Sequence, residues 1–227
     1  MEKKYEHKLL NKYDLIAGSD EAGRGCLAGP VVSASVLLKK PQESIRFLSK
    51  FIIEDSKKIT SKKRENVVKA LTKEESFASF LESLKYSWSN QYISVEVEGR
   101  SARFIEEYNI LNASLDSMKS TFLSLKAPHY LRTIWLIDGN RKPNLENVES
   151  DVEALVKGDS KSVSIGLASI FAKVLRDKYM EYVDSLEPSY GFQKHKGYPT
   201  PFHKKAIKVH GPSIFHRKSF KGVSEFC

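Results

Sequence analysis

The sequence predicts an α/β domain with a sheet at its centre. Short apolar segments typical of strands alternate with longer segments in which apolar residues recur at helical spacing. With 227 residues, 41% of them hydrophobic, the chain is long enough for one domain and can bury a sizeable core. In sheet-based domains of this class, ligand sites collect at the ends of strands. Functional residues are therefore expected where the strands end.

Two strands are expected in the N-terminal part. Residues 15–20 and 31–38 are apolar segments joined through a glycine-rich turn and Pro30. The second segment carries no charge, as expected of a strand covered on both faces. A helix should follow from a hydroxyl cap within 59–61 to about Leu71.

The middle of the chain continues this alternation. Apolar residues from Phe77 to Trp88 recur at helical spacing, so a second helix is expected there, and residues 92–97 alternate as a strand does. A long amphipathic helix over 104–125 should pack one face on a core. A short buried strand over 134–137 then ends in an acid.

Two more helices are expected in the C-terminal part. One covers 163–184, and a shorter one lies around 202–209, after the pattern changes at Pro188 to glycine, proline, histidine and aromatic residues. These complete the expected alternation of strands and helices.

Basic charge is concentrated at the C-terminal end. The formal net charge is +9, from 37 basic and 28 acidic residues, and residues 188–227 hold eight Lys or Arg and one acid. Such a local excess is the electrostatic footprint of a nucleic-acid-binding face, although a solvated charged surface gives the same composition. We expect a main domain over 1–187 and a basic C-terminal extension over 188–227 packed on it as one structural unit.

The cysteines and histidines indicate no disulfide framework and no zinc site. Cys26 and Cys227 are the only cysteines, and the six histidines lack paired ligand spacing. No apolar run is long enough to span a bilayer, and residues 1–13 are too polar for a signal peptide. We expect a soluble, cytoplasmic protein with no membrane partner, and a monomer by default.

Carboxylates stand where the expected strands end. Asp20 and Glu21 close the first strand, Asp138 follows the strand over 134–137, and Asp159 lies in a polar turn before a helix. Oxygen donors collected in this way suit a hard divalent cation such as Mg²⁺. Four converging carboxylates with no bases nearby need compensating cations, and two ions about 4 Å apart can activate a water and stabilise the leaving oxygen of a phosphodiester.

Each acid also has a simpler interpretation. A single acid is most often a surface residue or a helix cap, and Asp159 stands where an N-cap is favoured. Asp20 and Glu21 are neighbours, so a regular strand directs them to opposite faces. Both reach one site only if the chain leaves the pleat there, which the following glycines allow.

The glycine-flanked Arg24 predicts close contact with a phosphorylated ligand. Gly23 and Gly25 let the backbone approach a ligand, and the guanidinium reaches phosphate or sugar oxygens. The alternative is that Arg24 is structural and pairs with an acid. Sequence alone leaves both open.

Two further segments are candidates for substrate contact. Lys57 and Lys58 lie in a polar turn and either contact phosphates or are simply solvated. Tyr198 lies in a basic loop that also contains glycine and proline. Its ring either stacks on a base or sugar or packs in the core.

Short motifs follow one another in a fixed order over roughly residues 14–221. They are Asp20-Glu21-Ala22-Gly23-Arg24-Gly25, Gly29-Pro30-Val31-Val32, Asp55-Ser56-Lys57-Lys58, Asn109-Ile110-Leu111, Ile137-Asp138-Gly139-Asn140, Lys157-Gly158-Asp159-Ser160, Ala168-Ser169-Ile170-Phe171-Ala172-Lys173-Val174 with Arg176-Asp177, His195-Lys196-Gly197-Tyr198-Pro199-Thr200, His210-Gly211-Pro212 and Phe215-His216-Arg217-Lys218-Ser219-Phe220. This series resembles the ribonuclease HII family (type 2 ribonuclease H), in its bacterial branch.

The resemblance implies a ribonuclease H-like fold, with a mixed central sheet flanked by helices and a basic C-terminal helical lobe that binds substrate. It implies that Asp20, Glu21, Asp138 and Asp159 hold divalent metals, Mg²⁺ or Mn²⁺, and are the catalytic residues. By the same resemblance, 23–25 reads the ribose 2′-hydroxyl at a ribonucleotide–deoxyribonucleotide junction, and the matching tyrosine in 195–200, Tyr198, stacks on the following sugar.

The activity implied by the resemblance is endonucleolytic. The family cleaves the RNA strand of RNA–DNA hybrids and cuts on the 5′ side of a single ribonucleotide in duplex DNA, as ribonucleotide excision repair requires. The partners implied are these two kinds of duplex.

Three departures from the family pattern leave the acids and 23–25 untouched. Cys26 stands where proline is frequent, residues 165–167 replace a Ser/Ala-rich run, and 77–91 is longer than typical. Metal preference and the packing of the helix over 163–184 are the properties most open to change.

Two other functions fit part of the pattern. A ribonuclease HIII-like enzyme cuts hybrids but not single embedded ribonucleotides, and that branch carries an extra N-terminal domain, whereas about thirteen residues precede the first strand here. A non-catalytic nucleic-acid-binding protein is expected to lack a carboxylate, and all four are present. Chelation by EDTA separates a metal-dependent nuclease from a non-catalytic binding protein, because nucleic-acid binding survives removal of the metal and cleavage does not.

Overall fold

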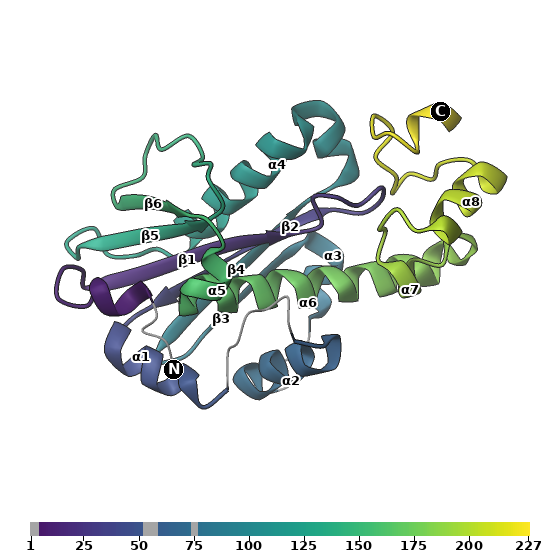
Figure 1. Cartoon of the computed structure of the whole chain (residues 1–227). Coiled ribbons are helices and arrows are strands. Elements are labelled where there is room, and N and C mark those ends of the chain that lie inside the picture. Colours follow the sequence, from purple (N-terminus) through teal and green to yellow (C-terminus); the bar gives the residue numbers. More distant parts are fainter. Residues whose placement is uncertain (1–4, 52–58, 74–76) are drawn as a thin grey trace.

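Six strands form one mixed sheet in the order β3-β4-β2-β1-β5-β6 (Figure 1). The computed structural model describes residues 5–51, 59–73 and 77–227. Within that part of the chain β1 runs antiparallel to β2 and parallel to β5, and β5 runs parallel to β6. The strands are β1 (Leu15–Ala22), β2 (Val31–Leu38), β3 (Lys85–Ser89), β4 (Ile93–Arg100), β5 (Thr133–Asp138) and β6 (Asp151–Leu155).

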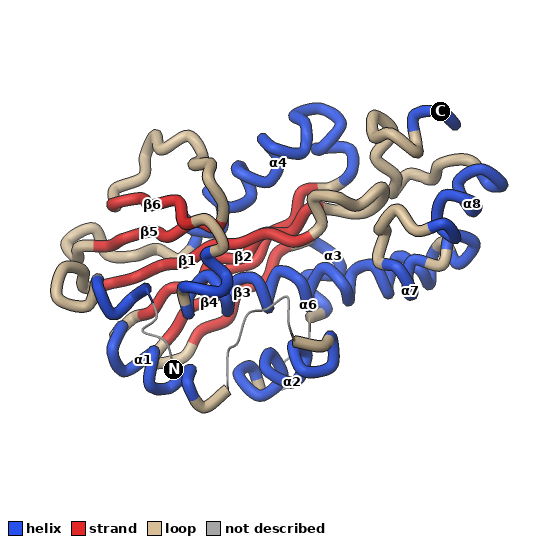
Figure 2. The backbone as a smooth tube through the Cα atoms, in the orientation of Figure 1, coloured by secondary structure: helices blue, strands red, loops and turns tan. Residues whose placement is uncertain are grey.

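Helices cover both faces of the sheet (Figure 2). The helix α6 (Val163–Leu186) packs on β1 and β2 from one side, and α4 (Ala102–Ser124) packs on β2 and β4 from the other. The α6 face is closed further by α1 (Pro41–Ser49), α2 (Ser61–Thr72) and α3 (Ala78–Ser83), which add apolar side chains to the same core. All eight residues of β2 are buried, as expected of a strand covered on both faces.

Gly18 lets α6 approach the middle of β1. A Cβ at this position would lie 2.4 Å from the backbone nitrogen of Ile165. Because the start of α6 is this close to the sheet, the segment that precedes the helix is brought to the end of β1. That segment contains α5 (Gly158–Lys161), which carries one of the candidate acids.

The expected helix between Phe77 and Trp88 is wrong in its second half. The helix α3 ends at Ser83, where Leu84 adopts a left-handed conformation with φ 57°. Trp88 lies in β3, opposite Val95 of β4. Trp88 continues the helical spacing of the apolar residues before it only by coincidence. Residues 85–89 form a strand because they pair with β4.

The long helix α4 is interrupted near its start. Asn109 has φ 62° and ψ 163°, outside helical values, and its side chain accepts a hydrogen bond from the Asn112 N–H at 3.0 Å. Asn109 therefore caps the longer second part of α4. Tyr108, in the expected core stripe, is 46% exposed because it lies beside this break.

The C-terminal segment packs on the half of α6 that extends beyond the sheet (Figure 1). It contains η2 (Pro188–Tyr190), α7 (Phe192–His195), α8 (Pro201–His210) and η3 (Ser224–Phe226). Phe192 and Ala206 join Met180 and Val183 of α6 in a small separate core. Among the described helices, none combines the length and apolar character that crossing a membrane requires.

Candidate active site

The strand β1 continues past the point where its partner β5 turns away. Pairing between β1 and β5 ends at Ser19 and Ile137, whereas β1 remains paired with β2 as far as Ala22. Asp20 and Glu21 therefore lie on a stretch of strand with one free edge. The expectation that the chain must leave the strand here is wrong, because β1 stays paired with β2 through Ala22 and both side chains nevertheless line one cavity.

A cavity of about 410 Å³ lies at this strand end. Three of the four candidate acids line it, together with residues from the glycine loop, α2, α6 and the loop before α8. Its lining residues are Asp20, Glu21, Ala22, Gly23, Arg64, Asp138, Ser169, Lys173 and Tyr198.

Asp20 is the most deeply placed acid of the cavity. It is 4% exposed. Burial raises the pKa of Asp20 well above its ordinary value, and the carboxylates of Glu21 and Asp138 raise it further. Hydrogen bonds from Ser169 and from the Glu21 N–H partly offset this rise. Three acids therefore interact electrostatically at the end of β1.

Asp138 and Asp159 are linked through the start of α5. The Asp138 Oδ1 accepts a hydrogen bond of 2.6 Å from the Gly158 N–H. Asp159 follows in the first turn of α5 and is 3% exposed, but it is not among the residues that line the cavity. The N-cap of α5 is Lys157, so the interpretation of Asp159 as a cap is wrong.

Bases lie closer to the acids than the sequence suggested. Arg64 and Lys173 line the cavity, and the Lys173 Nζ lies 2.7 Å from Asp177 Oδ1. The Arg24 Nη1 lies 3.2 Å from Glu21 Oε1 in a pair whose arginine side chain is half exposed. Within the described ranges, no group of three or more His, Cys, Asp or Glu residues is arranged so that it could hold a metal ion.

The two glycines beside Arg24 have different surroundings. Gly23 has φ +97°, and a Cβ there would lie 2.0 Å from the Arg176 Nε. A Cβ on Gly25 would meet nothing within 4 Å. The group that approaches Gly23 is thus a side chain of the protein itself, whereas Gly25 faces open space.

Tyr198 lies at the mouth of the acidic cavity with a partly exposed ring. It is 40% exposed, the Lys173 Nζ lies 5.2 Å from its ring centroid, and the Arg176 Cζ lies 5.9 Å away. Partial burial and the neighbouring Cys26 raise the pKa of the Tyr198 hydroxyl. The interpretation of Tyr198 as a fully packed core residue is wrong.

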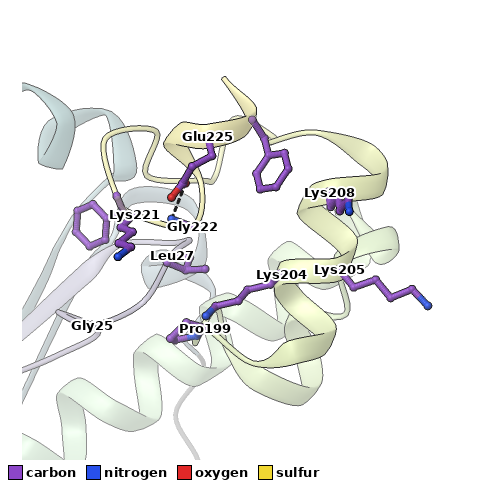
Figure 3. A pocket seen from close by; sticks show the side chains of 11 residues that line it. Gly25, Leu27, Pro199, Lys204, Lys205, Lys208, Lys221, Gly222 and Glu225 are labelled. Carbon is purple, nitrogen blue, oxygen red and sulfur yellow. Dashed lines mark hydrogen bonds between the residues drawn. The ribbon is translucent and has the colours of Figure 1, made fainter.

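A second cavity, of about 810 Å³, is lined by Gly25 of the glycine loop and by residues of the C-terminal segment (Figure 3). Gly23 and Tyr198 line the first cavity, and Gly25 and Pro199 line the second, so the two cavities share a wall. The second is lined by Gly25, Leu27, Pro199, Lys204, Lys205, Lys208, Phe220, Lys221, Gly222, Glu225 and Phe226. We call it the lysine pocket.

The lysine pocket combines an apolar floor with positive charge. Its lining residues include four lysines, three of them on α8, and one acid, Glu225. The Glu225 Oε2 accepts a 2.7 Å hydrogen bond from the Gly222 N–H (Figure 3). Hydrogen bonds from the backbone N–H groups of Glu225 itself and of Gly222 lower the pKa of this carboxyl group. The concentration of base expected over 188–227 therefore lines a surface hollow beside Gly25.

The remaining predictions have mixed outcomes. Lys57 and Lys58 lie outside the described residues. Ser169, Lys173 and Arg64 line the acidic cavity although sequence reasoning singled out none of them as site residues. Ser169 and Lys173 stand in a motif of the family resemblance, which could have indicated them, but no sequence pattern pointed to Arg64.

Solved structures share this fold. A chain in the structure described as the PCNA:RNase HII complex from Archaeoglobus fulgidus aligns with a TM-score of 0.68 at 24% identity, over 91% of this chain and 95% of that chain. Bst-RNase HIII in complex with Mn²⁺ aligns with a TM-score of 0.67 at 16% identity, over 95% of this chain and 70% of that chain. The fold and the acidic strand end define a ribonuclease H-like α/β protein.

Sequence comparisons narrow this class to one family. The family model of ribonuclease HII matches residues 17–223. The ribonuclease HII of Vibrio parahaemolyticus is 43% identical over 213 residues, covering 94% of this chain and 87% of the relative. The ribonuclease HII of Desulfotalea psychrophila is 39% identical over 214 residues, covering 94% and 84%. The chain belongs to the ribonuclease HII family, and it is an endoribonuclease, a hydrolase acting on the RNA strand of RNA–DNA hybrids.

Proposed function

We propose that the chain also cuts duplex DNA on the 5′ side of a single ribonucleotide, using divalent metal ions, Mg²⁺ or Mn²⁺. The observation that carries this proposal is the cavity in which three carboxylates, the glycine loop and Tyr198 meet. A scissile phosphate in this cavity would lie beside both the acids and the residues that recognise the neighbouring sugar.

The donor types at the site are those that a hard divalent cation takes, and metal binding would draw together acids that do not form a three-ligand group as they lie in the described structure. Asp20, Glu21 and Asp138 offer carboxylate oxygens at one strand end, with Asp159 one residue beyond the Gly158 contact. Burial and the carboxylates of Glu21 and Asp138 raise the pKa of Asp20, so a bound cation would relieve the repulsion among these acids. Two cations bound here would activate a water and stabilise the leaving oxygen of the phosphodiester.

The residues around the acids would hold and orient the substrate. Arg24 is half exposed at the cavity edge and can reach a phosphate, and the open surroundings of Gly25 admit a ribose to the backbone. The 2′-hydroxyl of that ribose distinguishes RNA from DNA. The exposed ring of Tyr198 would stack on the next sugar.

The lysine pocket continues this path along the duplex. It shares a wall with the acidic cavity at 23–25 and 198–199, so a strand read at Gly25 extends over α8. Lysine side chains bind phosphates without regard to sequence. We propose that 188–227 is in this sense a substrate-binding extension of the catalytic domain over 1–187.

The experiment compares three end-labelled duplexes: DNA with one ribonucleotide, all-DNA, and an RNA–DNA hybrid. Each is incubated with Mg²⁺, Mn²⁺ or EDTA. We expect metal-dependent cleavage of the hybrid and a cut directly 5′ of the single ribonucleotide, with all-DNA untouched. Cleavage of the hybrid alone would instead indicate the ribonuclease HIII-like specificity. Binding without cleavage under every metal would overturn the catalytic assignment.

A further inference from the structure

Two completely buried arginines reach the glycine loop from distant parts of the chain. Arg176 lies on α6 and Arg217 in the segment after α8, and both side chains are 0% exposed. Within the described chain, neither is paired with a carboxylate at ion-pair distance. Burial and the neighbouring Arg176 lower the pKa of Arg217 to about 10, so the Arg217 guanidinium remains charged at neutral pH.

Backbone carbonyl groups take the place of acids around Arg217. The Nη2 donates to the Gly23 carbonyl at 2.7 Å, and the Nη1 donates to the Arg24 carbonyl at 2.9 Å. The Nε and Nη2 both donate to the Gly29 carbonyl, at 3.1 and 3.0 Å. One guanidinium thus joins the start of the loop to its end.

Arg176 holds the rest of the same loop. Its Nη2 donates to the Ala28 carbonyl at 3.1 Å and its Nε to the Pro30 carbonyl at 2.9 Å. The third nitrogen, Nη1, donates to the Lys196 carbonyl at 2.9 Å, in the loop that carries Tyr198. Arg176 therefore fixes the loop to the scaffold, but it contacts neither carbonyl beside Arg24.

The bonds from Arg217 decide which way two peptide groups face. In a trans peptide the C=O and the following N–H point in opposite directions. The Gly23 and Arg24 carbonyls are directed at the buried guanidinium, so the N–H groups of Arg24 and Gly25 are directed away from it. Neither N–H takes part in a hydrogen bond within the described residues. Gly25 faces open space and lines the lysine pocket, so these donors are available to a substrate.

We infer that Arg217 is a positioning residue for recognition of the ribose. It holds the Gly23–Arg24 and Arg24–Gly25 peptides so that their N–H groups face the 2′-hydroxyl and the adjoining phosphate. The inference rests on the proposed function, because it assumes that a ribonucleotide occupies the groove at Gly25. Arg217 itself does not touch the substrate.

The planar fork of arginine is what this role requires. Three nitrogens in a fixed plane serve three carbonyls at once, whereas an ammonium group is a single point with no such geometry. Lysine at position 217 would keep the buried charge but could not hold both peptides. Arg217→Lys therefore removes the hydrogen bonds that orient the glycine loop while it keeps the positive charge beneath the loop.

The test compares Arg217→Lys with the wild-type chain and with Arg100→Lys. Arg100 is a matched control because its guanidinium also joins two partners, Glu98 and Asp116, and donates to no carbonyl of residues 23–30 in the described structure. Binding of all-DNA and single-ribonucleotide duplexes is measured in EDTA by fluorescence anisotropy, and cleavage kinetics in Mg²⁺. Circular dichroism confirms that each variant is folded at the assay temperature.

For Arg217→Lys we expect unchanged affinity for all-DNA and loss of the preference for the ribonucleotide. We also expect kcat/KM to fall by at least about tenfold, since a misplacement of about 1 Å can cost about 100-fold in rate. Arg100→Lys should leave the affinity for all-DNA, the preference for the ribonucleotide duplex and kcat/KM unchanged. Retained preference and retained kcat/KM in Arg217→Lys would overturn the inference, and so would equal weakening of both duplexes.

A measurement on the wild-type chain covers the case in which Arg217→Lys does not fold. Amide resonances of Arg24 and Gly25 should shift on titration with the single-ribonucleotide duplex and not with all-DNA. Equal shifts with both duplexes, or none, would overturn the inference. A wild-type chain that neither prefers nor cleaves the ribonucleotide duplex would instead contradict the proposed function.

Discussion

At the scale of single residues, Gly23 and Gly25 flank the same arginine for different physical reasons. Gly23 combines a left-handed φ with contact from the Arg176 side chain, so nothing larger fits. Gly25 has free space around it and lines the lysine pocket. The first glycine is required by the fold, and the second is free to serve the ligand.

Alanine substitutions should separate these two requirements. Gly23→Ala would place a Cβ 2.0 Å from the Arg176 Nε and 2.8 Å from the Pro30 carbonyl oxygen. We expect it to lower the free energy of unfolding by about 2–4 kcal/mol. Gly25→Ala should change it by less than about 0.5 kcal/mol and instead raise KM for the ribonucleotide duplex. Urea unfolding and cleavage kinetics measure the two effects, and equal destabilisation by both variants would contradict this distinction.

Asp138 is the acid whose charge can be removed with least change in structure. An asparagine amide oxygen can still accept the hydrogen bond from the Gly158 N–H. We expect Asp138→Asn to cleave at least ~100-fold more slowly, because it loses a charge to which the proposed function assigns metal binding, while duplex affinity stays within a factor of two.

The control for Asp138→Asn is Asp14→Asn. Asp14 also accepts a backbone N–H bond, from Arg132 at 2.9 Å, at the opposite end of β1. Asp14→Asn should leave the rate of cleavage unchanged. A parallel loss of cleavage and duplex binding in Asp138→Asn would count against a metal-binding role.

At the scale of elements, the sequence predicts the buried strands and long helices well and the sheet edges poorly. The strand over 31–38 and the helix over 163–184 have continuous apolar character, and the structure confirms both as β2 and α6. The edge strands β3 and β6 are half exposed, and neither has a run of apolar residues. Pairing with their neighbours creates these strands, and such pairing is not visible in local sequence.

Local sequence also shows only part of the candidate active site. Asp20, Glu21 and Asp138 are visible because acids at strand ends are unusual, and the structure brings all three to one cavity. Arg176 and Arg217 are not visible as buried residues, because composition counts them as ordinary surface bases. Their burial depends on carbonyl groups about 150 and 190 residues earlier in the chain.

The helix α8 carries much of the positive charge of the lysine pocket. Lys208→Glu should weaken binding of every duplex by a similar factor and lower the slope of log K against log salt by about 1. The expected control is Lys126→Glu, an exposed residue after α4 and outside the lysine pocket, which should leave the slope unchanged. Salt titrations of duplex binding measure the slope, and a sequence-dependent loss would argue against phosphate contact.

At the scale of the whole molecule, a hydrogen-bonded pair of buried histidines, His203 and His216, joins the segment after α8 to the loop that carries Tyr198. The Ser213 N–H donates to His216 Nδ1 at 3.0 Å, and His203 Nδ1 lies 2.9 Å from the Tyr198 carbonyl. The two Nε2 atoms are 3.1 Å apart. One consistent arrangement exists: His203 donates to Tyr198, His216 donates to His203, and both rings are neutral.

Acid should therefore loosen this part of the molecule. Burial lowers the pKa of His203 and of His216 to about 4, below the unfolded value of 6.5. The unfolded chain binds more protons between these values, so the stabilisation is complete above pH 6.5 and is lost as the pH falls toward 4. We expect the urea midpoint to fall over this range. His216→Asn should make the urea midpoint less dependent on pH, whereas His129→Asn, at an exposed position, should not. An unchanged pH dependence in His216→Asn would contradict the role assigned to the histidine pair.

The binding of the glycine loop by Arg217 has a consequence for synthesis of the protein. A ribosome makes residues 23–30 early, but six of the eight carbonyl groups in this loop receive hydrogen bonds from residues of the range 176–217. Contacts this far apart in the chain form late in folding. A nascent chain that stops before position 217 carries the acidic strand end and the glycine loop, but not the side chain that holds the Gly23 and Arg24 carbonyls. On the proposed function, ribose recognition would therefore be acquired only after nearly the whole polypeptide has been translated.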